Sequence, residues 1–208
     1  NQTNTSVVSI QNSPDVDTTG IFKGFTIKNA DFNGLDINGN SPKLIDLVIE
    51  NNHQNGIYIE GNTNNNGWRP LYLKNVRIQN NGYDQYIGFS QINARWIKNL
   101  TMIDVVIEKG SNNHNQFVFN LRSSEGPFNF QNVTIIDYSS GGAGTLNFQY
   151  NAFGVIDNIK IIHQGVLNYN PAITIDNCND FNINNALLLN NGISRSGTGI
   201  RINRSNGD

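Results

Sequence analysis

The sequence VIENNHQNGIYIEGN, residues 48–62, holds two short runs of alternating apolar and polar residues that are separated by Asn and Gly. Such alternation is typical of β-strands, and the Asn55-Gly56 pair favours a turn. The stretch could therefore form one β-hairpin or one rung of a longer repeat. The rest of the chain decides between the two.

The same plan of strand, turn and strand recurs along the chain. Successive copies begin 22 to 29 residues apart, and a third short run, such as LYLK at 71–74, precedes the leading residue. Periods of this length are typical of solenoids, in which each repeat stacks on the next. The copies begin at Gly24, Asp46, Asn75, Asp104, Asn132, Asn158 and Asn185.

Three short strands in each stacked repeat predict an all-β fold, a single-stranded right-handed parallel β-helix of about seven coils. The right hand is expected because crossovers between parallel strands are overwhelmingly right-handed. We expect one domain over residues 1–208, with 1–20 as an entry segment or partial coil and 21–208 as the repeats. The start NQTNTSVVSI has neither Met nor a signal-like segment, so we expect a fragment of a larger chain.

The composition excludes several classes of function. Of the 208 residues, 39 are Asn and 20 are Gly, so turn formers are abundant and a helical fold is not expected. A net charge of −2 without a Lys/Arg cluster removes the electrostatic basis for binding nucleic acid. The chain has no apolar run long enough for membrane insertion, and we predict no cofactor and no metal site.

Alternation within the strands also predicts which side chains form the core. We expect inward columns at Val76/Ile78, Val105/Ile107, Val133/Ile135, Ile159/Ile161 and Ala186/Leu188. Five residues after each leading position we expect an interrupted asparagine ladder, at Asn29, Asn51, Asn80, Lys109, Asp137, His163 and Asn190. Gly34, Gly56 and Gly199 precede second strands and are expected to adopt positive φ.

The rung NGIYIEG at 55–61 resembles the N-G-I-x-I-x-G rungs of the pectin-lyase-like superfamily of right-handed parallel β-helices, and the resemblance spans about residues 21–208. Members of this superfamily are mostly polysaccharide lyases, glycoside hydrolases, epimerases and bacteriophage tailspikes, so the resemblance implies a glycan ligand. A fold hosts many activities, however, and the function must be argued from a site.

Three catalytic signatures of the superfamily are missing from the sequence. It contains no Asp-Asp pair or His-Gly as in polygalacturonases, no Arg-x-Pro-x-x-Arg as in pectate lyases and no Asp-Pro-His-Asp as in alginate epimerases. By elimination the chain is most similar to the tailspike depolymerases, which share no catalytic motif. That resemblance implies a polysaccharide ligand, a trimer and an extracellular or virion-surface location.

The first candidate site lies on the outward side of the second strands. The Asp36 and Glu60 carboxyls should be about 8 Å apart, because neighbouring strands are about 4.8 Å apart and alternate residues about 6.6 Å. This fits the spacing of about 6.5 to 9.5 Å between the acid and base of an inverting glycosidase. Tyr58, Trp68 and Arg69 would bind the sugar beside them. The alternative is that all are ordinary solvated groups.

The neighbours of this site are expected in two columns. One should run Asp36, Tyr58, Gly88, Val118, Asn147, Thr174, Arg201, and the other Asn38, Glu60, Ser90, Asn120, Gln149, Asp176, Asn203.

A second choice of carboxylate pair lies on the first strands. Glu50 and Glu108 should occupy one column, two rungs or about 9.6 Å apart, with Gln79 between them and Arg77 close by as a substrate-binding residue.

Two functions remain open from the sequence. The chain is either a glycan-binding and glycan-cleaving hydrolase or lyase, or a non-catalytic shaft or receptor-binding module. We also expect a homo-oligomer, because the outward side of the first strands turns apolar toward the C-terminal end, and soluble monomers rarely expose such a stripe. An intrachain flap could cover the stripe instead. Its residues are Ile136, Ile162, Leu187 and Leu189.

Overall fold

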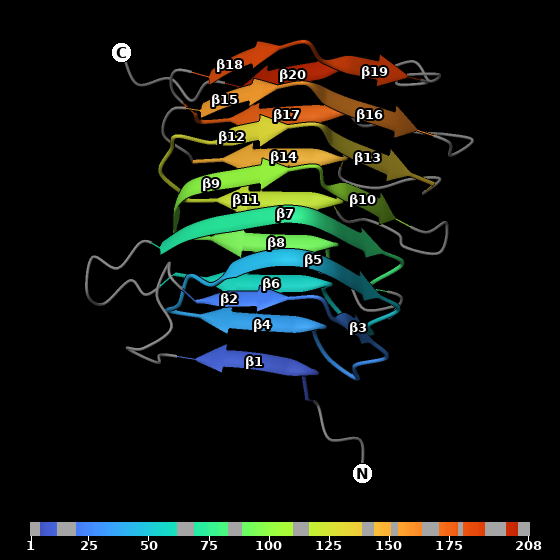
Figure 1. Ribbon diagram of the computed structural model, residues 1–208. Helices are drawn as coiled ribbons and strands as arrows, with labels where there is room; N and C mark the ends of the chain where they lie inside the picture. The colour runs from blue at the N-terminus through green and yellow to red at the C-terminus, as the bar shows by residue number, and fades with distance from the viewer. Residues whose placement is uncertain are drawn as a thin grey trace.

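The computed structural model describes residues 5–11, 20–61, 69–82, 89–109, 117–138, 144–150, 154–163, 171–178, 181–189 and 199–203. Within these ranges all regular structure is β-strand, and the strands are stacked coil upon coil along one axis (Figure 1). The protein is therefore the parallel β-helix that the sequence predicts.

Sheet A contains the strand that follows the turn in each repeat, which is the second strand counted from the leading residue. Its eight strands run parallel to one another, and each pairs with the strands of the coils before and after it. Its outward side chains therefore form columns along the stack. In order, the strands are β1 (Val8–Gln11), β4 (Leu35–Asn38), β6 (Ile57–Glu60), β8 (Ile92–Arg95), β11 (Phe119–Arg122), β14 (Leu146–Gln149), β17 (Ile173–Asp176) and β20 (Ile200–Asn203).

The second sheet bends into two faces, which we call B1 and B2. Two long strands, β5 (Lys43–Glu50) and β7 (Arg69–Gln79), run through the bend and belong to both faces. Face B1 also contains β2 (Ile21–Lys23), β9 (Ile97–Ile103), β12 (Asn129–Gln131), β15 (Gly154–Asp157) and β18 (Phe181–Asn184). Face B2 also contains β3 (Thr26–Lys28), β10 (Val106–Lys109), β13 (Val133–Asp137), β16 (Ile159–His163) and β19 (Leu187–Leu189).

The coils are less uniform than seven sets of three short strands. Among the described residues, five coils have three separate strands, whereas β5 and β7 each join two strands of a coil into one. The segment before the repeats contributes β1, which pairs with β4 and extends sheet A by one strand.

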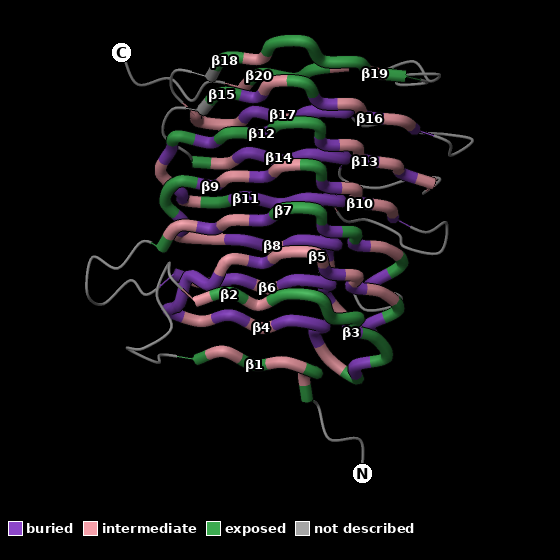
Figure 2. Tube along the Cα trace, in the orientation of Figure 1, coloured by how far each residue is buried: buried purple, intermediate pink, exposed green. Residues whose placement is uncertain are grey.

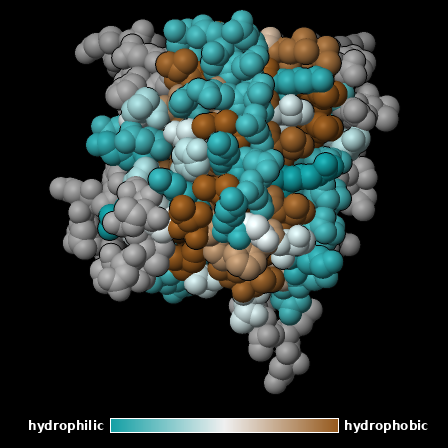
Figure 3. Space-filling view, in the orientation of Figure 1, coloured by the Kyte–Doolittle hydropathy of each residue, from teal (hydrophilic) through white to brown (hydrophobic). Residues whose placement is uncertain are grey.

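The bend between B1 and B2 explains why every repeat begins with Gly, Asp or Asn. At this asparagine corner, Asp46, Asn75, Asp104, Asn132, Asn158 and Asn185 have φ between 50 and 57°, and Gly24 has a φ of 80°. These residue types tolerate the left-handed conformation best. Exposed amides bond along the corner, as from Asn75 Nδ2 to Asp46 Oδ1 at 2.8 Å. Figure 3 shows the resulting hydrophilic band along the stack.

The inward columns of the first strands are confirmed in four of the five repeats. Val76, Ile78, Val105, Ile107 and their counterparts in β13 and β16 are at most 2% exposed. Figure 2 shows this buried interior along the middle coils of the stack. In the last repeat Ala186 is exposed and Leu188 half-buried, because β19 is the terminal strand of its sheet and no described coil covers it.

The buried asparagine ladder lies one residue later than predicted. Asn51 and Asn80 are exposed and adopt positive φ, which turns the following residues, Asn52 and Asn81, into the interior. Asn52 Nδ2 donates to Asn81 Oδ1 at 2.8 Å, and Asn81 Nδ2 donates to Gln91 Oε1 at 2.9 Å. The predicted member Asn190 lies outside the described residues.

Three ionisable residues of the predicted ladder do point inward and form a separate buried cluster. Lys109, Asp137 and His163 are register partners on adjacent strands and are at most 2% exposed. Thr145 Oγ1 lies 2.6 Å from His163 Nε2 and donates to Asp137 Oδ2 at 3.3 Å. Burial lowers the pKa of Lys109 and of His163 against the opposing effect of the Asp137 carboxylate.

The glycines before the second strands do not adopt the positive φ that we predict for them. Gly34, Gly56 and Gly199 fall outside the left-handed region. Gly34 and Gly56 are needed for space, because a Cβ on Gly56 would lie 2.7 Å from both Asn81 Nδ2 and Gln91 O. The buried ladder thus requires a residue without a side chain in the neighbouring coil.

Candidate functional site: a groove along the edge of sheet A

The outward columns of sheet A differ from the predicted ones in two coils. Ser90 and Val118 are buried, whereas the outward positions of β8 and β11 belong to Asn93, Arg95, Asn120 and Arg122. The turns before these strands are longer than we expect, and the prediction placed the strands too early. The predicted Gly88 lies outside the described residues.

One column at the end of the sheet A strands carries most of the charge. Along the stack it reads Asn38, Glu60, Arg95, Arg122, Gln149, Asp176 and Asn203. Its two arginines are not among the site residues predicted from the sequence. The repeated Asn-x-Arg of Asn93-Ala94-Arg95 and Asn120-Leu121-Arg122 was the signal that could have aligned the two strands.

Asp36 and Glu60 lie on adjacent coils, as predicted from the sequence. Asp36 is the register partner of Tyr58 and Asn38 that of Glu60, so the two carboxyls are diagonal neighbours about 8 Å apart by strand spacing. Burial raises the pKa of the Asp36 carboxyl, and the Glu60 carboxylate raises it further, against the hydrogen bond from Asn33 Nδ2 at 3.3 Å. Asp36 therefore keeps its proton to higher pH than an ordinary aspartate.

Glu60 is held by two donors on the same oxygen. Tyr58 Oη donates to Glu60 Oε2 at 2.7 Å, and Arg95 Nη2 donates to the same atom at 2.5 Å. Arg95 and Glu60 thus form a charge-assisted hydrogen bond. Burial, the hydrogen bond to Glu60 and the charge of Glu60 raise the pKa of Tyr58 to about 12, so Tyr58 remains a neutral donor.

The next residue after each sheet A strand forms a second corner, which we call the aromatic corner. Trp96, Ser123, Tyr150 and Asn177 stand there in successive coils with φ between 48 and 55°. Backbone hydrogen bonds repeat along it, from Trp96 N to Arg122 O at 3.2 Å and from Ser123 N to Gln149 O at 2.9 Å. Trp96 and Tyr150 are therefore held two coils apart, about 9.6 Å, with the small Ser123 between them.

The aromatic corner and the charged column enclose a groove of about 350 Å³, the sheet A groove. Arg95 lies over the Trp96 ring, with its guanidinium carbon 4.6 Å from the ring centroid. The same carbon is 6.0 Å from the centroid of the Tyr58 ring. Arg95 Nε is buried and has no hydrogen bond with another described residue, a cost that calls for an explanation such as a bound water, ion or ligand. The lining residues are Tyr58, Asn93, Arg95, Trp96, Arg122, Ser123, Gln149 and Tyr150.

Two of the predicted substrate-binding residues do not line this groove. Arg69 is exposed at the start of β7, on face B1. Arg77 lies at the other end of the same strand, on face B2. Trp68 lies outside the described residues. Tyr58 is the predicted substrate-binding residue that does line the groove. Trp96 and Tyr150, which were not predicted, supply further aromatic surface.

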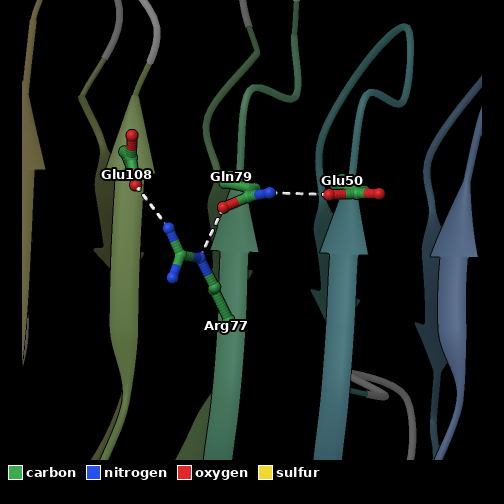
Figure 4. Close-up of polar contacts among 4 residues, drawn as sticks. All are labelled: Glu50, Arg77, Gln79 and Glu108. Atoms are coloured by element: carbon green, nitrogen blue, oxygen red, sulfur yellow. Dashed lines mark hydrogen bonds and ion pairs between the residues drawn. The ribbon is translucent and has the colours of Figure 1, made fainter.

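The second carboxylate pair forms a fully connected polar row on face B2 (Figure 4). Gln79 Nε2 donates to Glu50 Oε2 at 2.6 Å, and Arg77 donates to Gln79 Oε1 and to Glu108 Oε2 at 2.5 and 3.1 Å. Val48 and Val106 flank Arg77 in its column. Both carboxylates are thus satisfied by their neighbours on an outward sheet face.

A larger groove, of about 440 Å³, follows the asparagine corner. Among the described residues that line it there is no aromatic side chain, and the single carboxylate, Asp104, accepts a hydrogen bond from Asn132 Nδ2 at 3.0 Å. It offers neither a stacking surface nor a pair of carboxylates, so we place the candidate site in the smaller sheet A groove.

The predicted apolar stripe occupies the end of the same B2 column. Glu108, Ile136, Ile162 and Leu189 are successive register partners, and Leu187 lies beside Leu189 in β19. Leu187 and Leu189 are 49% and 38% exposed, while Ile136 and Ile162 are half-buried. Hydrophobic atoms gather on this side of the stack in Figure 3.

The described residues contain no cluster of three or more His, Cys, Asp or Glu side chains arranged to hold a metal ion. They also contain no helix with the length and apolar character needed to cross a lipid bilayer.

Comparisons with known proteins do not add a family or a function. No protein-family model, no curated protein and no solved structure matches the chain. The site's own geometry is therefore the basis for the functional conclusion.

Proposed function

We propose that the protein binds a polysaccharide in the sheet A groove, with Asp36 and Glu60 as acid and base for its cleavage at one end. The observation that carries the proposal is the pair Trp96 and Tyr150, held two coils apart on the same corner beside a row of polar side chains. Aromatic rings bury the apolar faces of sugars, and Asn and Arg side chains donate to their hydroxyl groups.

The shape of the groove supports an extended ligand. It covers the coils from β6 to β14, a length of about 14 Å at about 4.8 Å per coil. Because the same backbone geometry recurs in each coil, the groove presents similar positions at regular intervals. A polymer with a regular repeat can use such positions in succession, as one small molecule cannot.

The difference between the two carboxyl environments supports a hydrolytic role. Asp36 has a raised pKa and can donate its proton to the glycosidic oxygen, whereas the Glu60 carboxylate, held by Tyr58 and Arg95, can accept a proton from water. The water attacks the anomeric carbon, the glycosidic bond breaks, and the configuration inverts. Asp36 lies one coil before the groove, so the cleaved bond would lie at the N-terminal end of the bound segment.

The binding step is tested by glycan arrays of bacterial surface polysaccharides. Trp96→Ala and Tyr150→Ala should each weaken binding about tenfold or more, since they remove stacking area without disturbing the core. Tyr72→Ala is the matched control, because Tyr72 is a half-buried tyrosine on face B1, away from the groove. If Trp96→Ala and Tyr150→Ala bind the glycan as tightly as the control Tyr72→Ala does, the groove is not the glycan site.

The alternative function, a non-catalytic shaft or receptor-binding module, also has one observation in its favour. Glu60 Oε2 already accepts two hydrogen bonds, which weakens it as a proton acceptor. Release of reducing ends, or ultraviolet absorbance from unsaturated products, would identify a hydrolase or a lyase respectively. Glycan binding without either signal would leave the module as the function.

We further propose that the apolar stripe on face B2 is covered by a second copy of the chain in a homo-oligomer, a trimer by the tailspike resemblance. The same B2 column is polar at its N-terminal end and apolar at its C-terminal end. In copies arranged parallel around a cyclic axis, the polar coils of one copy would contact the polar coils of the next. The apolar coils would likewise contact apolar coils. A monomer by light scattering would favour an intrachain flap instead.

A further inference from the structure

The charged column of sheet A contains one cation that its neighbours leave uncompensated. Glu60 pairs with Arg95, and Gln149 Nε2 donates to Asp176 Oδ2 at 3.3 Å, so both pairs are directed away from the middle of the column. Arg122 stands between them, is exposed, and has no hydrogen bond or ion pair with another described residue. Its guanidinium is available to a ligand.

Arg122 is also the cation nearest to the gap between the two aromatic residues. Ser123 follows it at the aromatic corner, one coil from Trp96 on one side and one coil from Tyr150 on the other. The spacing of about 9.6 Å between those two coils exceeds twice a contact distance of about 3.5 to 4.0 Å, so one ring fits between them. A sugar seated over Ser123 would present its substituents to Arg122.

Guanidinium groups bind carboxylates, sulfates and phosphates through two parallel hydrogen bonds. An unpaired arginine beside a ring-sized gap therefore favours a sugar that carries an acidic group. Arg95 cannot serve equally, because Glu60 already occupies it and Trp96 covers one of its faces.

The flanks of the column limit how many acidic groups the ligand can carry. Glu60 and Asp176 lie two coils from Arg122 on opposite sides, about 9.6 Å away in each direction. An acidic group on the neighbouring sugar would approach Asp176 on one side and be repelled. On the other side Arg95 is already paired with Glu60, so it offers a second acidic group less attraction than Arg122 does.

We infer that the ligand of the sheet A groove is a glycan in which an acidic sugar is flanked by neutral sugars, with the acidic group held by Arg122. The inference rests on the proposed function and narrows its substrate class. It disfavours both neutral polymers and polymers with an acid on every ring.

The test is an array that sorts glycans into three classes: neutral, isolated acidic sugars, and acidic sugars throughout. Within the second class, carboxylated, sulfated and phosphorylated members identify the acid. The unmodified protein should bind the isolated-acid class most tightly, and Arg122→Gln should lose about tenfold or more of that binding. Lys28→Gln is the control, because it removes an exposed charge from β3 on face B2.

The outcomes separate this inference from the proposed function. Arg122→Gln should lose much more affinity for isolated-acid glycans than for neutral glycans, because Gln can still donate a hydrogen bond to a hydroxyl group but carries no charge, and Arg122→Lys should recover part of the acidic preference. Tightest binding to neutral or fully acidic glycans, or no effect of Arg122→Gln, would overturn the inference while Trp96→Ala still reports on the groove. Absence of binding to every class would remove the proposed function itself.

Discussion

The two carboxylate pairs, one on sheet A and one on face B2, are built from similar residues in different surroundings. On face B2, Glu50 and Glu108 are joined through Gln79 and Arg77 into a row in which each charged group has a partner (Figure 4). Among the described residues of sheet A, Arg122 has no partner, and Asp36 has an amide partner but no cation. Completed pairing stabilises a sheet face, whereas incomplete pairing leaves groups for a ligand.

Aromatic side chains separate the two regions further. The sheet A groove has Tyr58, Trp96 and Tyr150 along four coils, while the side chains flanking Arg77 in its column are Val48 and Val106. On face B2 the column that contains Glu108 continues with the apolar Ile136. The charged column of sheet A instead ends with the polar residues Asp176 and Asn203. The comparison assigns ligand binding to sheet A and favours protein contacts on B2.

The largest expected effect is on turnover of a cleaved glycan. Asp36→Asn combined with Glu60→Gln should lower turnover by about 100-fold or more, because proton transfer to and from the substrate is lost. Glu50→Gln combined with Glu108→Gln should leave turnover unchanged. Reducing-end release measures both, and a reversed result would move the active site to face B2.

A second large effect is expected on self-association. Leu187→Lys with Ile162→Lys should dissociate the assembly of the intact protein without unfolding it, because two charges would enter an apolar contact. Thr174→Lys on sheet A is the control, since its position in β17 lies on the other sheet. Light scattering at micromolar concentration gives the measurement. An unmodified protein that is already monomeric would contradict the oligomer.

A smaller effect distinguishes the two arginine networks in stability. Arg95→Ala should cost about 1 to 2 kcal/mol, since it removes the ion pair with Glu60 and the contact with the Trp96 ring. Arg77→Ala should cost less than about 1 kcal/mol, because Arg77 is 54% exposed and its ion pair is screened by water and salt. Urea unfolding compares them, and equal costs would mean that the networks are energetically alike.

The smallest effect concerns pH. The raised pKa of Asp36 means that the folded protein holds this proton more tightly than the unfolded chain, so the stability is full below the ordinary value of 3.8 and falls as pH rises through the shifted pKa. Asp36→Asn should therefore melt a few degrees higher than the unmodified protein at neutral pH, with the difference shrinking in acid. A lower melting temperature at neutral pH would show that the Asp36 carboxylate is stabilising.

Much of the fold could be read from local patterns. Alternation placed Val105 and Ile107 inside, and the register of face B2 brings Glu50, Gln79 and Glu108 into one column as predicted. These strands begin one or two residues after a leading residue whose identity is fixed by its positive φ. A sharp local signal at one end therefore sets the register.

The candidate site was predictable only in its first two coils. Asp36, Tyr58 and Glu60 follow short turns and were placed in the right order. The second strands of the next two coils follow longer turns. The segment QYIGF at 85–89 has the alternating sequence pattern of a strand, but the sheet A strand of that coil is INAR at 92–95. Arg95 and Arg122 were missed for that reason.

The sequence by itself determined the strands, the repeat and the corners, because alternation and left-handed residues are local properties of the chain. The tertiary structure decided which coils' residues share a column, since that depends on how each turn closes against the coil before it. It alone brought Trp96, Arg122 and Tyr150, residues far apart in the chain, to one edge. Stacking at about 4.8 Å per coil turns such distant residues into neighbours, and the groove exists only through that stacking.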